Sequence, residues 1–374
     1  MGREHRNASD RRPAARLAHR HLARFVARIE HVDPGAHRRI KGLRLVTAYG
    51  IAAALGSLPA VAHGFSSGSA IAMLAAGFAL WASVSEARMA RFESSRDLAV
   101  LCLAAALGAA SLAALAPAMS GFGRAGPEWI LLSGAFLAGF CRKYGVLGTG
   151  VGSQFYIGQL LAFGAGLGPA DLGAIAVAGA VAAVACIVPR LLSGPAERPA
   201  AVPQRIEALV DGPAAWLRPS PEFAMGLQAA SAALVVLLLN SACHLTESAW
   251  AITACVYVVA GSAAGTIDRV RRRIAGTLAG VPLGLMFLPV AGDYPLLVWA
   301  AASLAMIVYA MALPERYDIA CAAFAFTLVV TLAATGEHSV ALLASRTWET
   351  ILGGALGAAA AKWIFPLRPA RAET

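Results

Sequence analysis

Charged residues are scarce in this sequence. They make up 14% of the 374 residues, whereas hydrophobic residues make up 58% and the mean hydropathy is +0.65. A soluble domain carries about 25% charged residues, so the share of charged residues in this chain is roughly half of that in a soluble protein. We infer that lipid, and not water, covers most of its surface.

Sequence motifs for ATP binding and catalysis are absent. The chain has no GxxxxGK[ST] loop, which argues against direct ATP drive. It has no HExxH or GxSxG motif, so an integral-membrane enzyme is disfavoured. Its six cysteines form no CxxC pair, and His63, His244 and His338 lack the spacing of ligands. The sequence therefore predicts no enzyme, no metal site and no cofactor.

Sustained alternation of apolar and polar residues is also absent, which excludes a membrane-spanning barrel. Apolar segments of about 16–22 residues occur instead, long enough or nearly long enough to cross a bilayer as helices. The sequence predicts an all-α integral membrane protein with about twelve transmembrane helices, at 43–62, 66–84, 97–116, 127–142, 149–167, 171–190, 222–241, 247–265, 272–290, 294–313, 318–335 and 345–365.

Basic residues orient these helices. Of the 31 Lys and Arg residues, all except Arg124 and Arg346 fall on one side of the membrane when the spans are threaded in order. Cytoplasmic loops collect Lys and Arg, so both termini are predicted to be cytoplasmic. The formal charge of +10 then faces the anionic inner leaflet of the bilayer. Nucleic-acid binding is not needed to explain it.

The two halves of the sequence resemble each other. Matches occur in the same order and at similar offsets, pairing Gly42 with Gly226, Tyr144 with Tyr317 and Pro189 with Pro366. With six spans in each half, the repeats are predicted to be parallel. The domain organisation is a basic cytoplasmic tail (1–41), a first six-helix half (42–192), a Pro-rich cytoplasmic linker (193–221), a second six-helix half (222–368) and a short cytoplasmic tail (369–374).

The amino-terminal tail carries a basic stripe. Arg16, Arg20, Arg24 and Arg28 recur at steps of four, and apolar residues fall between them. One interpretation is a basic amphipathic helix that lies on the inner leaflet. The other is a solvated and partly disordered tail.

The stretch RVRRRIAGTLAGVPLGLMF (269–287) sets arginines directly before a glycine stripe. Small residues at steps of four share one helix face and allow another helix to approach closely in lipid, so they are predicted to pack helices within the chain or in a homo-oligomer. The glycines of this kind are Gly276, Gly280 and Gly284, with Gly353 and Gly357 in the last span.

The arginines before that stripe, Arg269, Arg272 and Arg273, have two interpretations. They hold the topology and reach lipid phosphates, or they concentrate an anionic solute at the cytoplasmic mouth of a pathway.

Ionisable residues inside membrane spans are costly, so they are candidates for function. Arg346 and Glu349 form either a local ion pair or a carboxylate-binding arginine with a proton-linked counter-charge. Trp250, three residues after Glu247, and Trp348, beside Arg346, act either as interface anchors or as stacking platforms. The further candidates for a substrate path are Glu247, Trp250, Arg316, Tyr317 and Trp348.

Polar residues deeper in the spans have two interpretations as well. They line a path, or they form hydrogen bonds to neighbouring helices. These residues are Gln154, Gln159, Thr253 and Tyr257.

Four ordered stretches in residues 222–368 resemble the fusaric acid resistance and aromatic acid exporter (FUSC-like) family. They are ESAWAITACVYVVAGSAAGT (247–266), RVRRRIAGTLAGVPLGLMF (269–287), ALPERYDIACAAFAFTLVVTL (312–332) and SRTWETILGGALGAAAAKWIFP (345–366). The resemblance implies a multi-pass protein of the bacterial inner membrane that exports aromatic carboxylic acids or similar organic anions. No acidic residue lies clearly mid-span, so the sequence favours membrane potential as the driving force, and a proton gradient coupled through Glu247 or Glu349 is the alternative. The resemblance also implies a periplasmic adaptor protein as a candidate partner. An organic-anion channel, similar to plant malate channels, is the alternative.

Overall fold

The structure is a computed structural model of the chain, and its described residues are almost entirely helical. No strand occurs among these residues, which confirms the predicted all-α class. Some predictions fall on residues outside the described ranges. They are the amphipathic helix in the tail, most of the linker, and Glu247. The described residues are 33, 36–63, 65, 68–87, 90–122, 126–193, 220–243, 245, 248–291, 294–313, 315–334 and 339–367.

Each predicted span overlaps one helix of ten residues or more. In the first half these are α2 (His37–Gly56), α4 (Gly68–Ser85), α5 (Arg91–Met119), α6 (Leu131–Phe140), α7 (Gly145–Gly164) and α8 (Leu172–Leu192), with the short α3 (Pro59–Ala62) after α2. In the second half they are α9 (Pro221–Cys243), α10 (Ser248–Val258), α11 (Ala263–Ala291), α12 (Pro295–Ala312), α13 (Tyr317–Ala334) and α14 (Val340–Trp363).

Five helical stretches in the described chain are long and apolar enough to cross a membrane: Arg91–Met119, Pro127–Gly164, Pro169–Leu192, Pro221–Cys243 and Pro295–Ala312. They indicate a multi-pass membrane protein, while the count of twelve spans stays a prediction. The second stretch bends at Gly145, whose φ of 74° suits glycine, and it continues there as α7, packed against α6.

Helices α11 and α14 begin earlier than the sequence predicts. α11 begins at Ala263 and not at 272, and α14 begins at Val340 and not at 345. Arginine and glutamate are good helix formers, so the helices continue through the charged residues beyond the apolar segments. Glu349 therefore lies well inside α14, and its side chain is fully buried.

Helix α10 ends earlier than predicted. It has 11 residues, about half of the 20 that a membrane span needs, and ends at Val258. Residues 259–262 are not helical, and α11 follows them. Irregular backbone is tolerated at membrane depth only where protein buries it or where it lines a cavity. Val259 and Ala260 are both buried.

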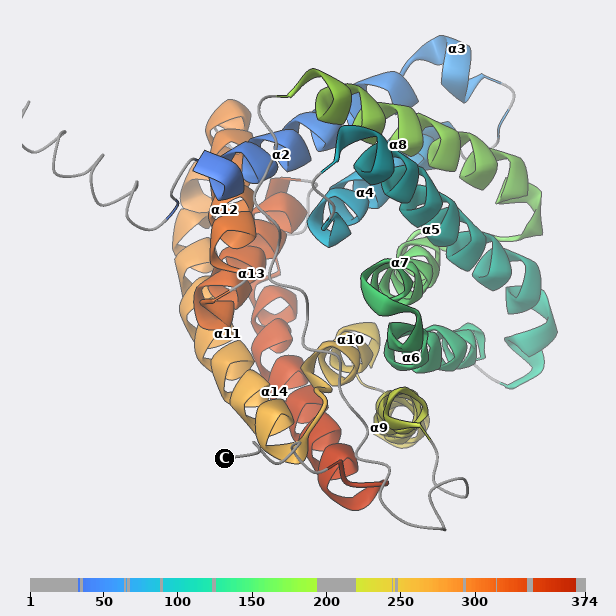
Figure 1. The fold of residues 1–374 in the computed structure, drawn as a ribbon, viewed down its shortest axis with the longest axis vertical. Helices are drawn as coiled ribbons and strands as arrows, with labels where there is room; N and C mark the ends of the chain where they lie inside the picture. Colours follow the sequence, from blue (N-terminus) through green and yellow to red (C-terminus); the bar gives the residue numbers. More distant parts are fainter. Residues whose placement is uncertain are drawn as a thin grey trace, which may run out of the picture.

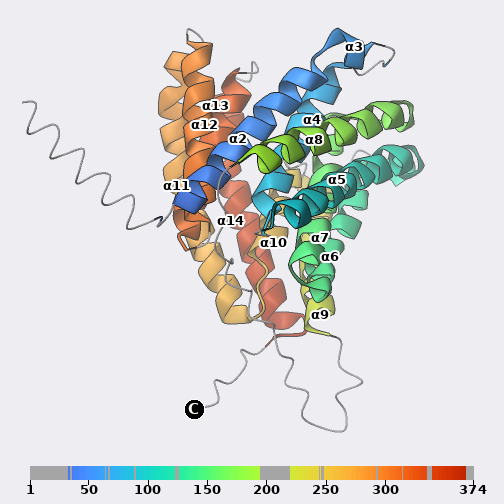
Figure 2. The same cartoon turned by 45° about the horizontal axis from the view of Figure 1, so that its top comes forward.

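The two halves face each other as two arcs (Figure 1). They meet at two seams, where α2 packs against α12 and α6 packs against α9 (Figures 1 and 2). Gly42 of α2 lies against Ile307 at one seam, and Gly226 of α9 lies against Phe136 at the other. Both seams are thus close helix crossings that a larger side chain would separate.

The glycine stripes pack helices within the second half. A side chain at Gly276 or Gly280 would overlap the carbonyl oxygens of Asp318 or Ala322 in α13, and Gly284 lies against Val329. In the same way, Gly353 and Gly357 of α14 lie against Ala251 and Val258 of α10. The close approach that the stripes predict thus occurs inside one chain.

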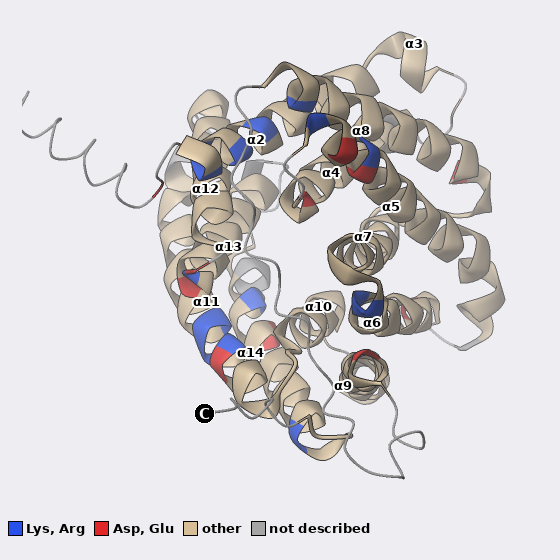
Figure 3. Ribbon diagram, in the orientation of Figure 1, with Lys and Arg blue, Asp and Glu red and all other residues tan. Residues whose placement is uncertain are grey.

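A buried ionic cluster joins four elements of the first half. Its members are Arg44 of α2, Glu86 after α4, Ser94 of α5 and Arg190 of α8, and we call it the Glu86 cluster. Arg44 Nη2 lies 3.1 Å from Glu86 Oε2, and Arg190 Nε lies 2.6 Å from Glu86 Oε1. Ser94 donates a hydrogen bond to the same carboxylate. Figure 3 shows basic and acidic residues gathered where α4, α5 and α8 meet.

Replacing Gly280 with Leu should destabilise the protein by about 1–3 kcal/mol or more, because the new side chain would push α13 away. The melting temperature in detergent measures this loss. Gly50→Leu is the matched control, because Gly50 lies in α2 and a Cβ atom added there would meet no other atom within 4 Å. Equal melting temperatures for the two variants would contradict this account.

Replacing Glu86 with Gln should destabilise the fold by about 3–5 kcal/mol, the usual cost of breaking a buried ion pair. The change removes the negative charge that Arg44 and Arg190 contact. Thermal unfolding followed by size-exclusion chromatography would detect it. Glu93→Gln, on the exposed first turn of α5, should leave the melting temperature nearly unchanged.

Candidate functional site

A cavity of about 940 Å³ lies between the two halves. Its wall is formed by residues of α2, α4 and α7 from the first half and of α10 to α14 from the second. This volume is within the range of small-molecule sites. Among the described residues, the charged side chains that line it are five arginines and two carboxylates: Arg142, Arg269, Arg272, Arg273, Arg346, Asp268 and Glu315. The lining is therefore cationic overall.

Three of these arginines converge at the end of α10. Arg142 lies in the 3-10 turn between α6 and α7, while Arg269 and Arg273 lie one turn apart on α11. Because α10 ends at Val258, the carbonyl of Val259 has no helical partner. Arg142 Nη1 and Arg269 Nη1 each donate a hydrogen bond of 3.2 Å to this oxygen. Arg273 Nη1 lies 3.3 Å from the Tyr317 hydroxyl. We call Arg142, Arg269 and Arg273 the arginine cluster.

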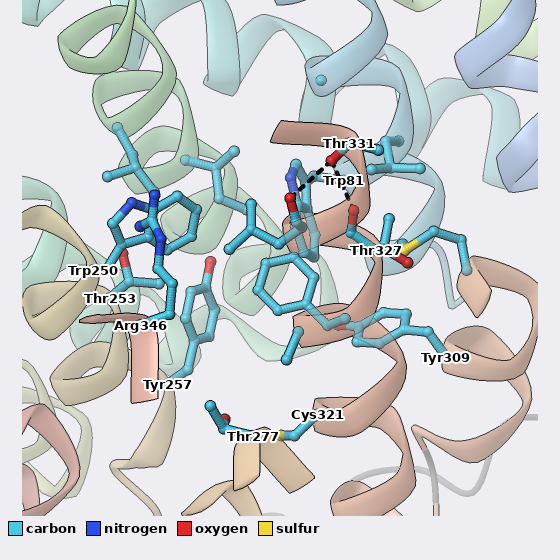
Figure 4. A pocket seen from close by; sticks show the side chains of 18 of the residues that line it. Trp81, Trp250, Thr253, Tyr257, Thr277, Tyr309, Cys321, Thr327, Thr331 and Arg346 are labelled. Carbon is cyan, nitrogen blue, oxygen red and sulfur yellow. Dashed lines mark hydrogen bonds between the residues drawn. The ribbon is translucent and has the colours of Figure 1, made fainter. Parts of the chain in front are cut away.

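Another arginine lies farther along the cavity, against an aromatic ring. The guanidinium carbon of Arg346 is 4.0 Å from the centre of the Trp250 ring. Figure 4 shows this stacked pair beside Thr253 and Tyr257. Gly353 and Gly357 allow α14 to approach α10 closely, and this approach brings Arg346 onto Trp250. The pair is a cation–π contact.

The opposite wall of the cavity is aromatic. Trp81 of α4 lies 5.4 Å from Phe324 and 6.2 Å from Tyr309, measured between ring centres. Figure 4 places Trp81 and Tyr309 across the cavity from Trp250 and Arg346. The cavity therefore offers cations on one side and ring faces and edges on the other, a combination that suits an anion with an apolar or aromatic body.

Hydroxyl groups join α7 to α10 beside the cavity. Tyr156 OH lies 2.8 Å from Thr253 Oγ1, and Ser153 Oγ lies 2.9 Å from Tyr257 OH. Gln154 and Gln159 point elsewhere: Gln154 donates to Ser85, and Gln159 donates to serines of α5 and α6. Of the four polar residues considered from sequence, Thr253 and Tyr257 line the cavity, and the two glutamines hold helices together.

The structure brings most of the predicted path residues to this cavity. Its lining includes Trp250, Arg269, Arg272, Arg273, Tyr317 and Arg346. Arg316 lies outside it and pairs with Asp318 at 2.8 Å, and the hydrogen bonds to Asp318 raise the pKa of Arg316. Trp348 is 42% exposed, and Glu349 is buried behind the wall.

Many of the cavity residues are not predicted from the sequence, and among them are Arg142, Trp81, Tyr309 and Phe324. The internal repeat is the signal that could have found Arg142. It matches RKYGV at 142–146 with ERYDI at 315–319, and so pairs Arg142 with Glu315, which also lines the cavity. The aromatic residues belong to three different helices and have no shared spacing.

No group of three or more His, Cys, Asp or Glu side chains in the described ranges could hold a metal ion. The chemistry that the arrangement suits is the binding of an anion.

Residues 231–360 match the model of a family described as fusaric acid resistance protein-like. The second half of the chain carries a fusaric acid resistance protein-like domain. This match confirms the resemblance found in the sequence and indicates a role in membrane efflux or transport. The domain contributes Trp250, Arg269, Arg273 and Arg346 to the cavity, whereas Arg142 lies outside the matched residues. No curated protein and no solved structure matches the chain.

Water access to the cavity can be tested with thiol labelling. In a variant whose native cysteines are replaced by alanine, Thr327→Cys should react with a membrane-impermeant, anionic thiosulfonate, because Thr327 lines the cavity. Ser133→Cys should not react, because Ser133 lies between helices where Gln159 donates to it. Labelling at both positions, or at neither, would contradict the cavity as described.

Proposed function

We propose that the protein is a secondary transporter that exports organic anions, in particular aromatic carboxylic acids, from the cytoplasm. The observation that carries this proposal is the excess of arginine over carboxylate in the wall of a cavity between the two halves. Guanidinium groups recognise carboxylates with paired hydrogen bonds. The aromatic wall formed by Trp81, Tyr309 and Phe324 supplies contacts for a ring.

Two driving forces are consistent with this site. With the cytoplasm negative, each negative charge exported gains about 2.3 kcal/mol per 100 mV. Proton coupling needs a buried acid, and Glu349 supplies one, three residues after the cavity-lining Arg346. Its depth in α14 makes proton coupling a stronger candidate than the sequence alone suggests.

We also propose that the two halves are parallel repeats with twelve spans and cytoplasmic termini. The seams support this proposal, because the sequence match pairs Gly42 with Gly226, and each of these glycines packs on the opposite half. The same match pairs Arg44 with Gln228. Arg44 reaches Ser193 after α8, and Gln228 reaches the carbonyl of Ile364 after α14.

The location that this proposal implies is the bacterial inner membrane. A non-enzymatic role belongs to the same proposal, because the arginines and aromatic rings of the described cavity wall suit the binding of an anion. A periplasmic adaptor and a homo-oligomeric state remain predictions from the resemblance and the glycine stripes.

Uptake of labelled 4-hydroxybenzoate into inverted vesicles tests the function. An imposed potential, positive inside, should drive saturable accumulation, and a pH gradient is applied separately to identify coupling. Passive flux that does not saturate and carries a matching current would indicate a channel instead. Absence of flux for every organic anion tested would remove the proposed function.

Arg346→Gln should reduce this uptake by at least tenfold while the protein stays inserted and folded. The variant removes a cation from the cavity wall but keeps a side chain that can lie on Trp250. Arg316→Gln is the matched control, because Arg316 lies outside the cavity and pairs with Asp318. Normal uptake by Arg346→Gln, or equal loss in both variants, would remove Arg346 from the pathway.

A further inference from the structure

The arginine cluster carries more positive charge than the cavity neutralises. The two carboxylates in the cavity wall are already paired with other arginines. Asp268 Oδ2 lies 2.9 Å from Arg272 Nε, and Glu315 pairs with Arg38 at the foot of α2. The hydrogen bond from Arg38 and its positive charge lower the pKa of Glu315, so this carboxylate is ionised and forms an ion pair with Arg38.

The arginine cluster itself has only neutral hydrogen-bond partners among the described residues. Arg142 donates to the Val259 carbonyl and contacts the Met225 sulfur, and Arg269 donates to the same carbonyl. Arg273 donates to the Tyr317 hydroxyl. Each guanidinium has five N–H donors, so most donors of the cluster are not used by these bonds. The Nε atoms of Arg142 and Arg273 are buried without a hydrogen-bond partner.

The shared carbonyl also fixes the arginines close together. Two nitrogens that each lie 3.2 Å from one oxygen are at most twice that distance apart. Arg273 follows Arg269 by one helical turn on the face of α11 that lines the cavity. Like charges held this close repel one another, and an anion placed among them removes the repulsion.

We propose that the arginine cluster binds a dianion of the dicarboxylate class, with one carboxylate on the Arg142–Arg269 pair and the second reaching Arg273. This inference rests on the proposed function, and it narrows the substrate from organic anions in general to those with two negative charges. A single carboxylate would leave two of the three positive charges unbalanced. Ring contacts with Trp81 and Phe324 are available to a dicarboxylate that has an aromatic body.

The test compares terephthalate with monomethyl terephthalate, which has nearly the same shape and one negative charge fewer. Titration calorimetry on the purified full-length protein should give a Kd for terephthalate at least tenfold lower than for the monoester. Uptake of both compounds into proteoliposomes is measured in parallel. A ratio of Kd values close to one would overturn the dianion assignment.

Variants of single arginines test whether the preference for terephthalate comes from the arginine cluster. Arg269→Gln should lower the ratio of the two Kd values to threefold or less. Arg269→Lys should keep most of the ratio found for the unaltered protein, because lysine keeps the charge. The Val259 carbonyl retains Arg142 in both variants, so α10 keeps a partner at its end. Arg271→Gln is the matched control, since Arg271 is exposed on the same helix and does not line the cavity.

The outcomes separate this inference from the proposed function. If Arg271→Gln and Arg269→Gln reduced the preference for terephthalate equally, the preference would come from the general positive charge of α11 and not from a specific site. That result would overturn the assignment. Transport of both compounds with no preference would leave organic-anion export standing and overturn the dianion class alone. If neither compound bound nor crossed the membrane, both proposals would fail.

Discussion

The pair of hydrogen bonds that Arg142 and Arg269 donate to the Val259 carbonyl is the interaction on which the site depends. A helix that ends inside a membrane protein leaves carbonyl groups that must find donors. Here the donors come from both halves of the chain, Arg142 from the first and Arg269 from the second. One oxygen thus closes the end of α10, links the halves and holds two cations at the cavity.

The two halves differ in which groups contact their arginines. In the first half, the Glu86 cluster balances Arg44 and Arg190 with a carboxylate and closes the junction of α2, α4, α5 and α8. In the second half, the residue matched with Arg44 is the neutral Gln228, and its amide bonds to backbone carbonyls. The arginines of the cluster on α11 have no such carboxylate in the described chain and face the cavity instead. The first half thus acts as a scaffold, and the second supplies most of the charged wall.

The helical class, the position of each apolar helix and the packing role of the glycine stripes follow from periodicity and composition. They are local properties, and the sequence displays them directly. The convergence of Arg142 with α11 is not local, because it depends on how the turn between α6 and α7 meets the break after α10. The burial of Glu349 inside α14 is not visible in the sequence either, since hydropathy marks where apolar residues begin, whereas the helix begins earlier at Val340. The Trp81–Phe324 contact joins two helices that are far apart in the chain. Neither helix has a sequence pattern that predicts this contact.

The shortness of α10 has a consequence for how voltage acts on this protein. Its 11 residues rise about 16 Å, roughly half the thickness of a hydrocarbon core. Where water fills the cavity up to the end of α10, the membrane potential falls over the remaining thin layer, so the local field there is steeper than in the surrounding bilayer. An anion exported as we propose would then cross most of the electrical distance in one short step. The rate of that step should depend on voltage more strongly than the rates of entry and release.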